Sequence, residues 1–427
     1  MRSFGGAAIL MRRNLKHEDR AALDKVTYLI GDADVLDWMP SLPSRTPFDA
    51  ACLDFLNAFS KILLSSKEAK AFPDVVTLGF WTRRASTAAL KKRFARDDGN
   101  FRLGRGVVFH IAPSNVPVNY AYSLITGLLT GNANVVRIPS KDFPQIRIIS
   151  QAFEEALHGH ESIRPYLCLV RYERDQGVND IFSAMSDVRV VWGGDETIYE
   201  LRRSPLPPRS TEITFANRYS IAVIDSDVYL QTEDKARVAE DFYNDTYLTD
   251  QNACTSTKLI VWLGKERTAA KRLFWRTLYD LVKRKYQFQP IMGVNKLTSA
   301  CRLLALLPGS RLISGEDNIL IRIEISSLPE WLIDFNENSG FFLEYDCEDI
   351  MELRDICDDT RCQTVGYLGS WEQMRPLLES GVKGIDRIVP IGKTMDFDLF
   401  WDGYDLMERM TRVIKIVESN KAGVAKS

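Results

Sequence analysis

The sequence lacks the features that mark membrane, secreted and nucleic-acid-binding proteins. Its best candidate for a membrane span, Tyr120 to Thr130, is interrupted by polar residues and a glycine, whereas a span needs about 20 apolar residues. The apolar run from Ala7 to Met11 is shorter than the core of a signal peptide. A net charge of -2 gives no reason to expect nucleic acid or an anionic membrane as a partner. We therefore expect a cytoplasmic protein without an integral membrane segment.

Disulfide and metal-binding patterns are also missing. The seven cysteines form an odd set with irregular spacing, which favours reduced thiols over a disulfide framework. Structural zinc sites take four protein ligands, usually from two closely spaced pairs. Cys357 and Cys362 have no partner pair of similar spacing. His158 and His160 lie at the end of a predicted helix without a third ligand. We predict no metal site.

The glycine-rich fingerprint of dinucleotide-binding proteins is incomplete. Gly104 and Gly106 have its first spacing, but Phe109 stands where the third glycine belongs, and the glycines precede a strand. Internal repeats and low-complexity segments are absent as well. What is present is ordinary globular composition, with 427 residues, 45% hydrophobic and 26% charged. This length allows about two or three domains with sizeable cores.

The order of predicted elements indicates an α/β protein. Residues 1–100 have apolar positions at helical spacing and form a mostly helical segment. From Gly106 onward, short apolar runs alternate with helices, which implies a parallel sheet covered on both faces. Such sheets bind ligands at the carboxyl ends of their strands. The predicted strands are 107–111, 135–138, 167–171 and 188–192, and the predicted helices are 118–130 and 145–157.

A second α/β run begins near residue 221. It contains a strand at 259–262, a helix at 267–285 and strand-like segments near 319–325 and 366–368. We place a domain boundary near residue 220, and we expect a tail helix after Trp401 to Tyr404 that docks back on the body. The predicted divisions are therefore 1–100, 101–220, 221–395 and a C-terminal tail at 396–427.

One loop has the composition of a nucleophile site. Cys254 lies within the run from Asp250 to Ser256, between an amphipathic helical segment and the strand at 259–262. Small polar neighbours leave room for a substrate carbonyl and leave backbone N–H groups free to point at it. Acyl transfer needs both, because negative charge develops on the carbonyl oxygen during attack. The alternative is a packed loop thiol without a chemical role.

Two polar residues surround the end of the first strand. Asn115 lies between Pro113 and Pro117, which stiffen its loop. A fixed carboxamide N–H suits an oxyanion hole, and the alternative is a turn asparagine that bonds its own backbone. His110 lies within the strand and is either a general base or a core histidine with satisfied ring nitrogens.

Other residues follow later strands of the same domain. Arg137 and Lys141 bracket a strand's carboxyl end, where they either face solvent or grip a ribose and a phosphate. Gly193 and Gly194 lead from a strand into a helix start, and free N–H groups there could face a pyrophosphate. The two acidic residues that follow would repel such a group.

Four segments follow one another in the sequence: 106–117 (GVVFHIAPSNVP), 131–141 (GNANVVRIPSK), 190–195 (VVWGGD) and 251–256 (QNACTS). Together they resemble the aldehyde dehydrogenase superfamily, and most closely its LuxC-like branch of fatty acyl-CoA reductases. The resemblance covers about residues 100–410, and the segments Pro390 to Gly392 and Trp401 to Asp405 are also similar to that branch. It implies an aldehyde dehydrogenase-like fold with two parallel-sheet α/β domains. These would be a nucleotide-binding domain, on which the helical N-terminal segment packs, and a catalytic domain.

The resemblance implies a role for each matching residue. Cys254 matches the nucleophile and Asn115 the oxyanion-hole asparagine. The remaining matches concern the nicotinamide cofactor. They are Arg137 for the adenosine ribose, Ser140 where NAD-preferring members carry a glutamate, Lys141 beside it, Gly193 and Gly194 for the pyrophosphate, and Glu337 for the nicotinamide ribose.

One departure from the superfamily pattern concerns the general base. Hydrolytic members place a glutamate ahead of the nucleophile, and Thr214 occupies the matching position here, with Glu212 nearby as a weak substitute. Without a base to activate water, an acyl-enzyme would persist until another acceptor arrives. This suits a reductase or an acyl-CoA exchange enzyme better than an acid-producing dehydrogenase.

The resemblance therefore implies reduction of an acyl thioester, carried by CoA or by a protein, to an aldehyde through an acyl-cysteine. Ser140 is neutral and lies between two cations, which favours NADPH, with NADH as the other candidate. Two alternatives stay open. One is a cofactor-free acyltransferase or thioesterase that uses Cys254 with His110, and the other is a non-catalytic subunit of an acyl-processing complex. Expected partners are a second copy of the chain or acyl-transferring and acyl-activating subunits.

Overall fold

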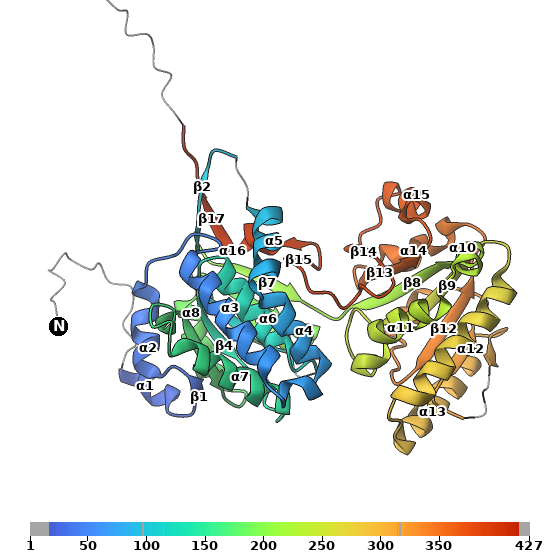
Figure 1. Ribbon diagram of the computed structural model, residues 1–427, viewed down its shortest axis with the longest axis horizontal. Coiled ribbons are helices and arrows are strands. Elements are labelled where there is room, and N and C mark those ends of the chain that lie inside the picture. The colour runs from blue at the N-terminus through green and yellow to red at the C-terminus, as the bar shows by residue number, and fades with distance from the viewer. Residues whose placement is uncertain (1–16, 96–97, 114, 314, 316, 418–427) are drawn as a thin grey trace, which may run out of the picture. The chain divides into compact units, whose positions relative to one another are not determined.

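The computed structural model describes residues 17–95, 98–113, 115–313, 315 and 317–417, so the apolar run at 7–11 lies outside the described part. The chain forms two compact units (Figure 1). The first unit contains the residues up to Ala216 together with those from Tyr404 onward, and the second contains Asn217–Gly403. Each unit is built around a largely parallel sheet, which confirms the α/β class.

The sheet of the first unit has the strand order β1-β5-β4-β3-β6-β7. Strands β3 and β6 are buried along their whole length, and β4 and β5 nearly so, because helices cover the sheet and the sequences are almost entirely apolar. All neighbours run parallel except β1, which pairs antiparallel with β5. The strands are β1 (Thr27–Ile30), β3 (Val107–Ile111), β4 (Ala133–Arg137), β5 (Leu167–Arg171), β6 (Val188–Trp192) and β7 (Thr211–Phe215).

The strand order reverses between β3 and β6. From β3 the chain moves outward through β4 and β5, and it then crosses to β6 and β7 on the other side. Val108 pairs with Asn134 on one side and with Val188 on the other. At such a switch point the following loops diverge and leave a crevice at the carboxyl ends of the strands. The loops after β3 and β6 are therefore the natural ligand-binding elements of this unit.

The N-terminal segment is mostly helical, as predicted. Phe55 and Phe59 of α3 stack on Phe153 of α7, with ring centroids 6.2 and 4.1 Å apart. Asp49 caps α3 by accepting a hydrogen bond from the Cys52 N–H. The helices of the first unit are α1 (His17–Leu23), α2 (Ala33–Trp38), α3 (Ala50–Ser65), α4 (Pro73–Thr82), α5 (Arg84–Phe94), α6 (Asn119–Leu129), α7 (Pro144–Leu157), α8 (Gln176–Met185), α9 (Asp195–Leu201) and α16 (Leu406–Met410).

The predicted tail helix is only partly correct. After the short α16, the chain forms β17 (Thr411–Ile414), which pairs antiparallel with β2 (Phe101–Gly104) (Figure 1). Two of the four β17 residues are exposed and three are β-branched, a composition that suits an edge ribbon better than a helix. Asn132 fastens this tail to the body, because its Nδ2 donates to the Met410 carbonyl at 3.1 Å.

The sheet of the second unit has the strand order β10-β11-β12-β9-β8-β13-β14. The edge strand β10 runs antiparallel to β11, and the other neighbouring strands of this sheet run parallel. The strands are β8 (Tyr219–Asp225), β9 (Thr257–Leu263), β10 (Arg311–Ile313), β11 (Ile321–Glu324), β12 (Phe341–Asp346), β13 (Cys362–Leu368) and β14 (Arg387–Pro390). The helices are α10 (Ser226–Gln231), α11 (Lys235–Asp245), α12 (Arg267–Lys285), α13 (Pro290–Leu306), α14 (Arg354–Asp358) and α15 (Arg375–Glu379).

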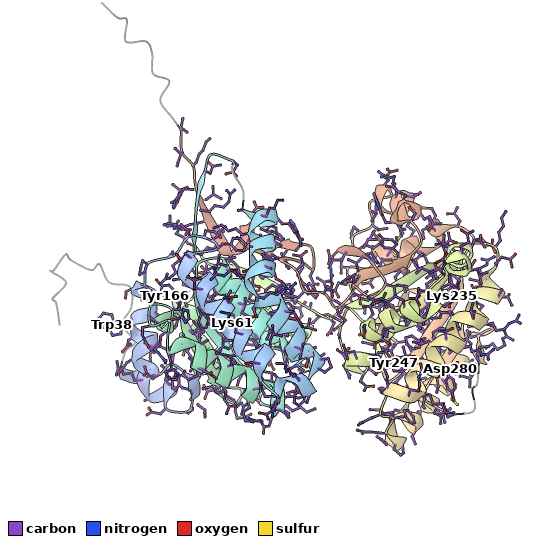
Figure 2. The ribbon with its side chains drawn as sticks, viewed as in Figure 1. Trp38, Lys61, Tyr166, Lys235, Tyr247 and Asp280 are labelled. Carbon is purple, nitrogen blue, oxygen red and sulfur yellow. The ribbon has the colours of Figure 1, made fainter. Side chains whose placement is uncertain are left out.

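An aromatic core lies between the second sheet and helices α11 and α12. It includes Phe242, Phe274 and Tyr247, which is labelled in Figure 2. The fully buried Glu344 crosses this layer and accepts hydrogen bonds from Trp262 Nε1 at 2.9 Å and Trp275 Nε1 at 2.6 Å. The Arg322 guanidinium donates at 2.7 Å and neutralises the charge. None of the helices in the described part of the chain has the length and apolar character needed to cross a bilayer.

Candidate active site

The loop that carries Cys254 lies at the amino end of β9, between the 3₁₀ helix η4 (Tyr247–Thr249) and the strand. Asp250 and Gln251 adopt left-handed backbone conformations, with φ of 53° and 57°. Such φ values are uncommon outside glycine and cost of order 1 kcal/mol or more each. The surrounding contacts must therefore hold the loop in this shape.

Gln251 is the residue that fastens the loop to β12. Its side chain is buried, and its Nε2 donates to the carbonyls of Thr257 at 2.9 Å and Phe341 at 3.0 Å. Its Oε1 accepts from the N–H groups of Gly340 at 2.8 Å and Phe341 at 3.0 Å. All four bonds satisfy buried polar groups, so they offset the backbone strain at this position.

Lys258 ties the same loop to the segment before β12. Its buried Nζ donates to the carbonyls of Gln251 at 2.6 Å and Glu337 at 2.9 Å, and also to Asn338 Oδ1. Burial lowers the pKa of Lys258 to about 7, and the charges of Glu337 and Asp250 oppose that shift. Because its amino group bonds three oxygens, Lys258 is a structural clamp within the second unit, and it was not recognised in the sequence.

Cys254 itself is exposed, and Ser220 Oγ donates to its carbonyl at 2.7 Å. Protein atoms nevertheless crowd around the sulfur, and this desolvation is the largest cause that raises the pKa of the thiol to about 12. The charge of Asp402 raises this pKa further, whereas Arg218 and the backbone N–H groups of Cys254 and Thr255 lower it. At neutral pH the residue therefore rests as a thiol that water can reach.

Glu337 lies in the same unit and lines a pocket of about 440 Å³ together with Arg302 and Trp331. Its Oε1 accepts from the Asn338 N–H at 3.1 Å, and its Oε2 accepts from Ser299 Oγ. The Lys258 amino group donates to the backbone carbonyls of both Glu337 and Gln251, so it links Glu337 to the loop that carries Cys254.

In the first unit, Asn115 is exposed in the loop between β3 and α6, and its neighbour Ser114 lies outside the described residues. Gly193 and Gly194 follow β6, so they lie on the other side of the same switch point. The Gly193 N–H donates to the Phe215 carbonyl at 3.2 Å, and Gly194 is the N-cap of α9. The predicted residues thus gather at one sheet edge.

Arg137 ends β4 at the same edge and is held by Tyr172. One guanidinium nitrogen donates to the Tyr172 carbonyl at 3.2 Å, and the guanidinium stacks 4.6 Å from the ring centroid. Ser140 and Lys141 are exposed in the next loop, where the Lys141 ammonium lies 4.8 Å from the Phe143 ring centroid. Arg137 and Lys141, the two cations predicted to grip a ribose and a phosphate, therefore both lie at this strand end.

His110 is fully buried, and its ring lies in a polar network. Ser123 Oγ is 2.7 Å from Nδ1, and Asn134 Oδ1 is 3.0 Å from Nε2. Trp192 Nε1 donates to the same Ser123 oxygen at 3.0 Å. Burial lowers the pKa of His110 to about 4, so the ring is neutral. Because both ring nitrogens are engaged, the arrangement favours the core role over the general base.

Residues 87–292 match the family model described as Acyl-CoA reductase (LuxC). The LuxC resemblance is confirmed. The LuxC-like chain is 24% identical to the long-chain acyl-protein thioester reductase of Vibrio harveyi over 332 residues, which is 74% of this chain and 65% of that protein. It is 22% identical to the reductase of the same name from Aliivibrio fischeri, over 67% of this chain and 58% of that protein. The match thus spans about three fifths of these relatives' length.

Solved structures show that the LuxC-like chain has the aldehyde dehydrogenase fold. The indole-3-acetaldehyde dehydrogenase AldA of P. syringae aligns with a TM-score of 0.63 at 14% identity, over 93% of this chain and 88% of that one. An NADP-dependent glyceraldehyde-3-phosphate dehydrogenase from Bacillus halodurans aligns with a TM-score of 0.59 at 15% identity, over 89% and 90% of the two chains. At these identities the likeness shows the fold alone.

The position predicted to lack the general base lies in β7 of the LuxC-like chain. Thr214 lies in β7, and Glu212 is the acidic residue beside it on that strand. The Glu212 carboxylate accepts from Arg189 Nε at 2.9 Å and from Arg202 Nε at 2.8 Å. Because both of its oxygens hold arginines, Glu212 is a structural ion-pair residue.

Sequence reasoning missed the charged groups beside Cys254 in the LuxC-like chain. Asp402 is 4% exposed, and Arg218 immediately precedes β8. In the sequence, the run from Trp401 to Asp405 shows a likeness to the family but gives no role for Asp402. The sequence signal at Asp402-Gly403 is only that of a tight turn, and the partners of Asp402 lie far away in the sequence.

Proposed function

We propose that the protein reduces a long-chain acyl thioester to an aldehyde through an acyl group bound to Cys254. The observation that carries the proposal is an exposed cysteine on a loop held in place by Gln251 and Lys258. Relatives of this chain named long-chain acyl-protein thioester reductases support the substrate class. Either a CoA thioester or an acyl-protein thioester would present the same reactive carbonyl.

In this mechanism the Cys254 sulfur forms a bond to the acyl carbon, and the bond from that carbon to the carrier sulfur breaks. We assign Asn115 as the donor to the developing oxyanion, since an exposed carboxamide on a loop with two prolines needs little reorganisation. Glu212 is committed to two arginines, so it cannot activate water. The acyl-enzyme is thereby protected from hydrolysis until it is reduced.

The residues of the first unit fit a nicotinamide dinucleotide. The switch point between β3 and β6 provides the crevice, and Arg137 and Lys141 provide cations beside it. When bound, the nicotinamide supplies the hydride that reduces the acyl group. We propose that Arg137 and Lys141 pair with a 2′-phosphate and that the exposed, neutral Ser140 leaves room for it, so that NADPH is preferred over NADH. Glu337 is proposed to hold the nicotinamide ribose.

The test separates acylation from reduction. The purified protein is mixed with acyl-CoA thioesters of increasing chain length and with an acyl-protein thioester, first without a reductant, and the acyl mass on Cys254 is mapped. NADPH or NADH is then added and the aldehyde is measured. An unmodified Cys254 with every thioester would contradict the proposal. The engagement of both His110 ring nitrogens in the core gives no support to the acyltransferase alternative in the form that uses His110 as its base.

A further inference from the structure

We propose that Asp402 takes the proton from the Cys254 thiol and delivers it to the departing thiol of the substrate. The inference rests on the proposed function and names the residue that handles the proton. The step needs such a group because Cys254 rests as a thiol. Thr214 stands at the position where a base would be expected, and Glu212 is committed to two arginines.

Backbone register brings the residues that bind Cys254 and Asp402 to the same level of the second sheet. Strands β8 and β13 are neighbours, with Tyr219 opposite Cys362 and Ile221 opposite Val365. Two β13 residues, of which one is Gln363, therefore face the single residue Ser220, which is the signature of a β-bulge. Bulges re-aim side chains at the start of a strand and occur beside active sites.

The two residues at this bulge hold the two reacting partners. Ser220 Oγ donates to the Cys254 carbonyl at 2.7 Å. Gln363 is fully buried, and its Nε2 donates to Asp402 Oδ1. Cys254 and Asp402 are therefore attached to adjacent strands at the same level of the sheet.

The second oxygen of Asp402 is available for a proton. Among the described residues, Asp402 Oδ2 is buried and makes no hydrogen bond, and the same is true of the Arg218 Nε that lies 3.7 Å away. An unpartnered oxygen on a carboxylate this deeply buried is costly. The positive φ of Asp402, 48°, and of Gly403, 73°, belong to the tight turn between β15 (Phe400–Trp401) and β16 (Tyr404–Asp405), where Asp-Gly is a preferred sequence, so this turn fixes the position of Asp402. A buried polar atom without a hydrogen bond calls for an explanation, and a functional role is one.

The surrounding charges keep this carboxyl close to its titration point at physiological pH. Burial is the largest cause that raises the pKa of Asp402 to about 6, and Asp386 adds to it, whereas Arg218, Gln363 and Arg387 lower it. The Arg387 guanidinium is held 4.3 Å from the ring centroid of Trp401. A group that titrates near the working pH exchanges protons most effectively.

The proposed step balances without a redox change. The Cys254 S–H bond breaks and its proton moves to Asp402 Oδ2 as the sulfur bonds to the acyl carbon. The carbon–sulfur bond to the carrier then breaks, and the departing thiolate takes the proton from Asp402. The net products are acyl-Cys254 and a free carrier thiol, with Asp402 again a carboxylate.

The experiment measures acylation of Cys254 by a long-chain acyl-CoA, without nicotinamide, by rapid quench and mass spectrometry between pH 5 and 9. In the wild-type protein the rate should rise with pH through a limb centred near pH 6. Asp402→Asn should slow acylation at pH 7 by about 10²–10³-fold and remove that limb. Asp386→Asn is the matched control, and it should keep the limb but move it to lower pH, because Asp386 raises the pKa of Asp402 and is not the residue that Gln363 orients.

Asparagine tolerates left-handed φ, so Asp402→Asn should fold, and thermal unfolding checks this. If it does not fold, Gln363→Met takes its place and should slow acylation on the order of tenfold while retaining the limb. A folded Asp402→Asn protein that is acylated as fast as wild type, or faster through loss of a repelling charge, would overturn the inference. A wild-type protein that is never acylated would instead overturn the proposed function.

Discussion

At the scale of single residues, exposure and surroundings separate Cys254 from the other cysteines. Cys52, Cys168, Cys347, Cys357 and Cys362 are buried. Cys301 is exposed like Cys254, but it lies on helix α13. Of these two exposed cysteines, Cys254 is the one in a loop. Exposure and loop position together therefore favour Cys254 as the proposed nucleophile.

Cys254→Ala should abolish both acyl-enzyme formation and aldehyde production, because no other group is placed to form the thioester. Cys301→Ala is the matched control and should retain both activities, since it removes the other exposed thiol. Labelled acyl-CoA followed by protein mass spectrometry reports the result. Label that remains covalently attached to the Cys254→Ala protein would contradict the assignment.

Asn115→Ala should lower turnover by about 10²–10³-fold, the usual cost of losing one oxyanion donor. The melting temperature should change little, because Asn115 is exposed in a loop. Steady-state aldehyde formation and thermal unfolding are measured side by side. Normal turnover in the variant would show that Asn115 is only a turn residue.

Ser140→Glu should shift the cofactor preference towards NADH, because a carboxylate accepts bonds from ribose hydroxyls and repels a 2′-phosphate. A charge-assisted contact contributes about 1.5–3 kcal/mol, so the wild-type preference for NADPH should be about tenfold to a hundredfold. Lys141→Ala should weaken use of NADPH alone. Equal kcat/KM for the two cofactors in wild type, unchanged in Ser140→Glu, would show an unselective pocket.

Residues next to strand ends were predictable from the sequence, whereas Asp402 was not. Asn115, Arg137 and Cys254 each adjoin a recognisable apolar run, so their surroundings follow from local pattern. Asp402 acquires its role from Gln363 and Arg218, which approach it only through tertiary packing. Contacts of that kind leave no periodic trace in the sequence.

At the scale of elements, strands β3, β5 and β6 and helix α12 have the bounds that the sequence predicts. Continuous apolar runs define the strands, and a regular pattern followed by a cluster of basic residues defines the helix. Strands β1 and β17 were missed because edge strands are short and partly exposed. Their partners, β5 and β2, are distant in the sequence.

The His110 network predicts that β3 is destabilised in acid. Its pKa is lowered from 6.5 to about 4, so the unfolded chain binds the proton more readily than the folded one. The contribution is complete above pH 6.5 and is lost as pH falls to about 4, a difference of about 3 kcal/mol. Hydrogen exchange of β3 in wild type and His110→Gln measures it. An equal acid dependence in both proteins would contradict the prediction.

The Glu344 network predicts a large cost when a buried charge pair is broken. Glu344→Ala leaves Arg322 buried without its partner and should destabilise the second unit by about 3–5 kcal/mol. Glu348→Ala is the matched control. Glu348 also pairs with an arginine, but its side chain is 80% exposed, so the expected loss is below about 1 kcal/mol. Denaturant unfolding of both variants compares the two, and similar losses would contradict the argument.

At the scale of the whole molecule, the family segments of the sequence predicted the fold more completely than composition did. Composition and length are those of many globular proteins. The ordered motifs implied two parallel-sheet α/β domains, and the structural relatives confirm the aldehyde dehydrogenase fold. No motif predicted that the C-terminal residues pack with the first unit, because this packing depends on the pairing of β17 with β2.

The return of the C-terminal residues to the first unit sets an order of events during synthesis on the ribosome. The second unit is one continuous segment, Asn217–Gly403, whereas the first is completed only by residues from Tyr404 onward. All strands of the first sheet have been translated once β7 ends at Phe215, so that sheet can assemble early. Strand β2 must wait, with its edge unpaired, until Thr411–Ile414 has emerged behind the entire second unit. The nascent chain thus carries an open strand edge for as long as the second unit takes to be made, and an open edge is where aggregation can begin.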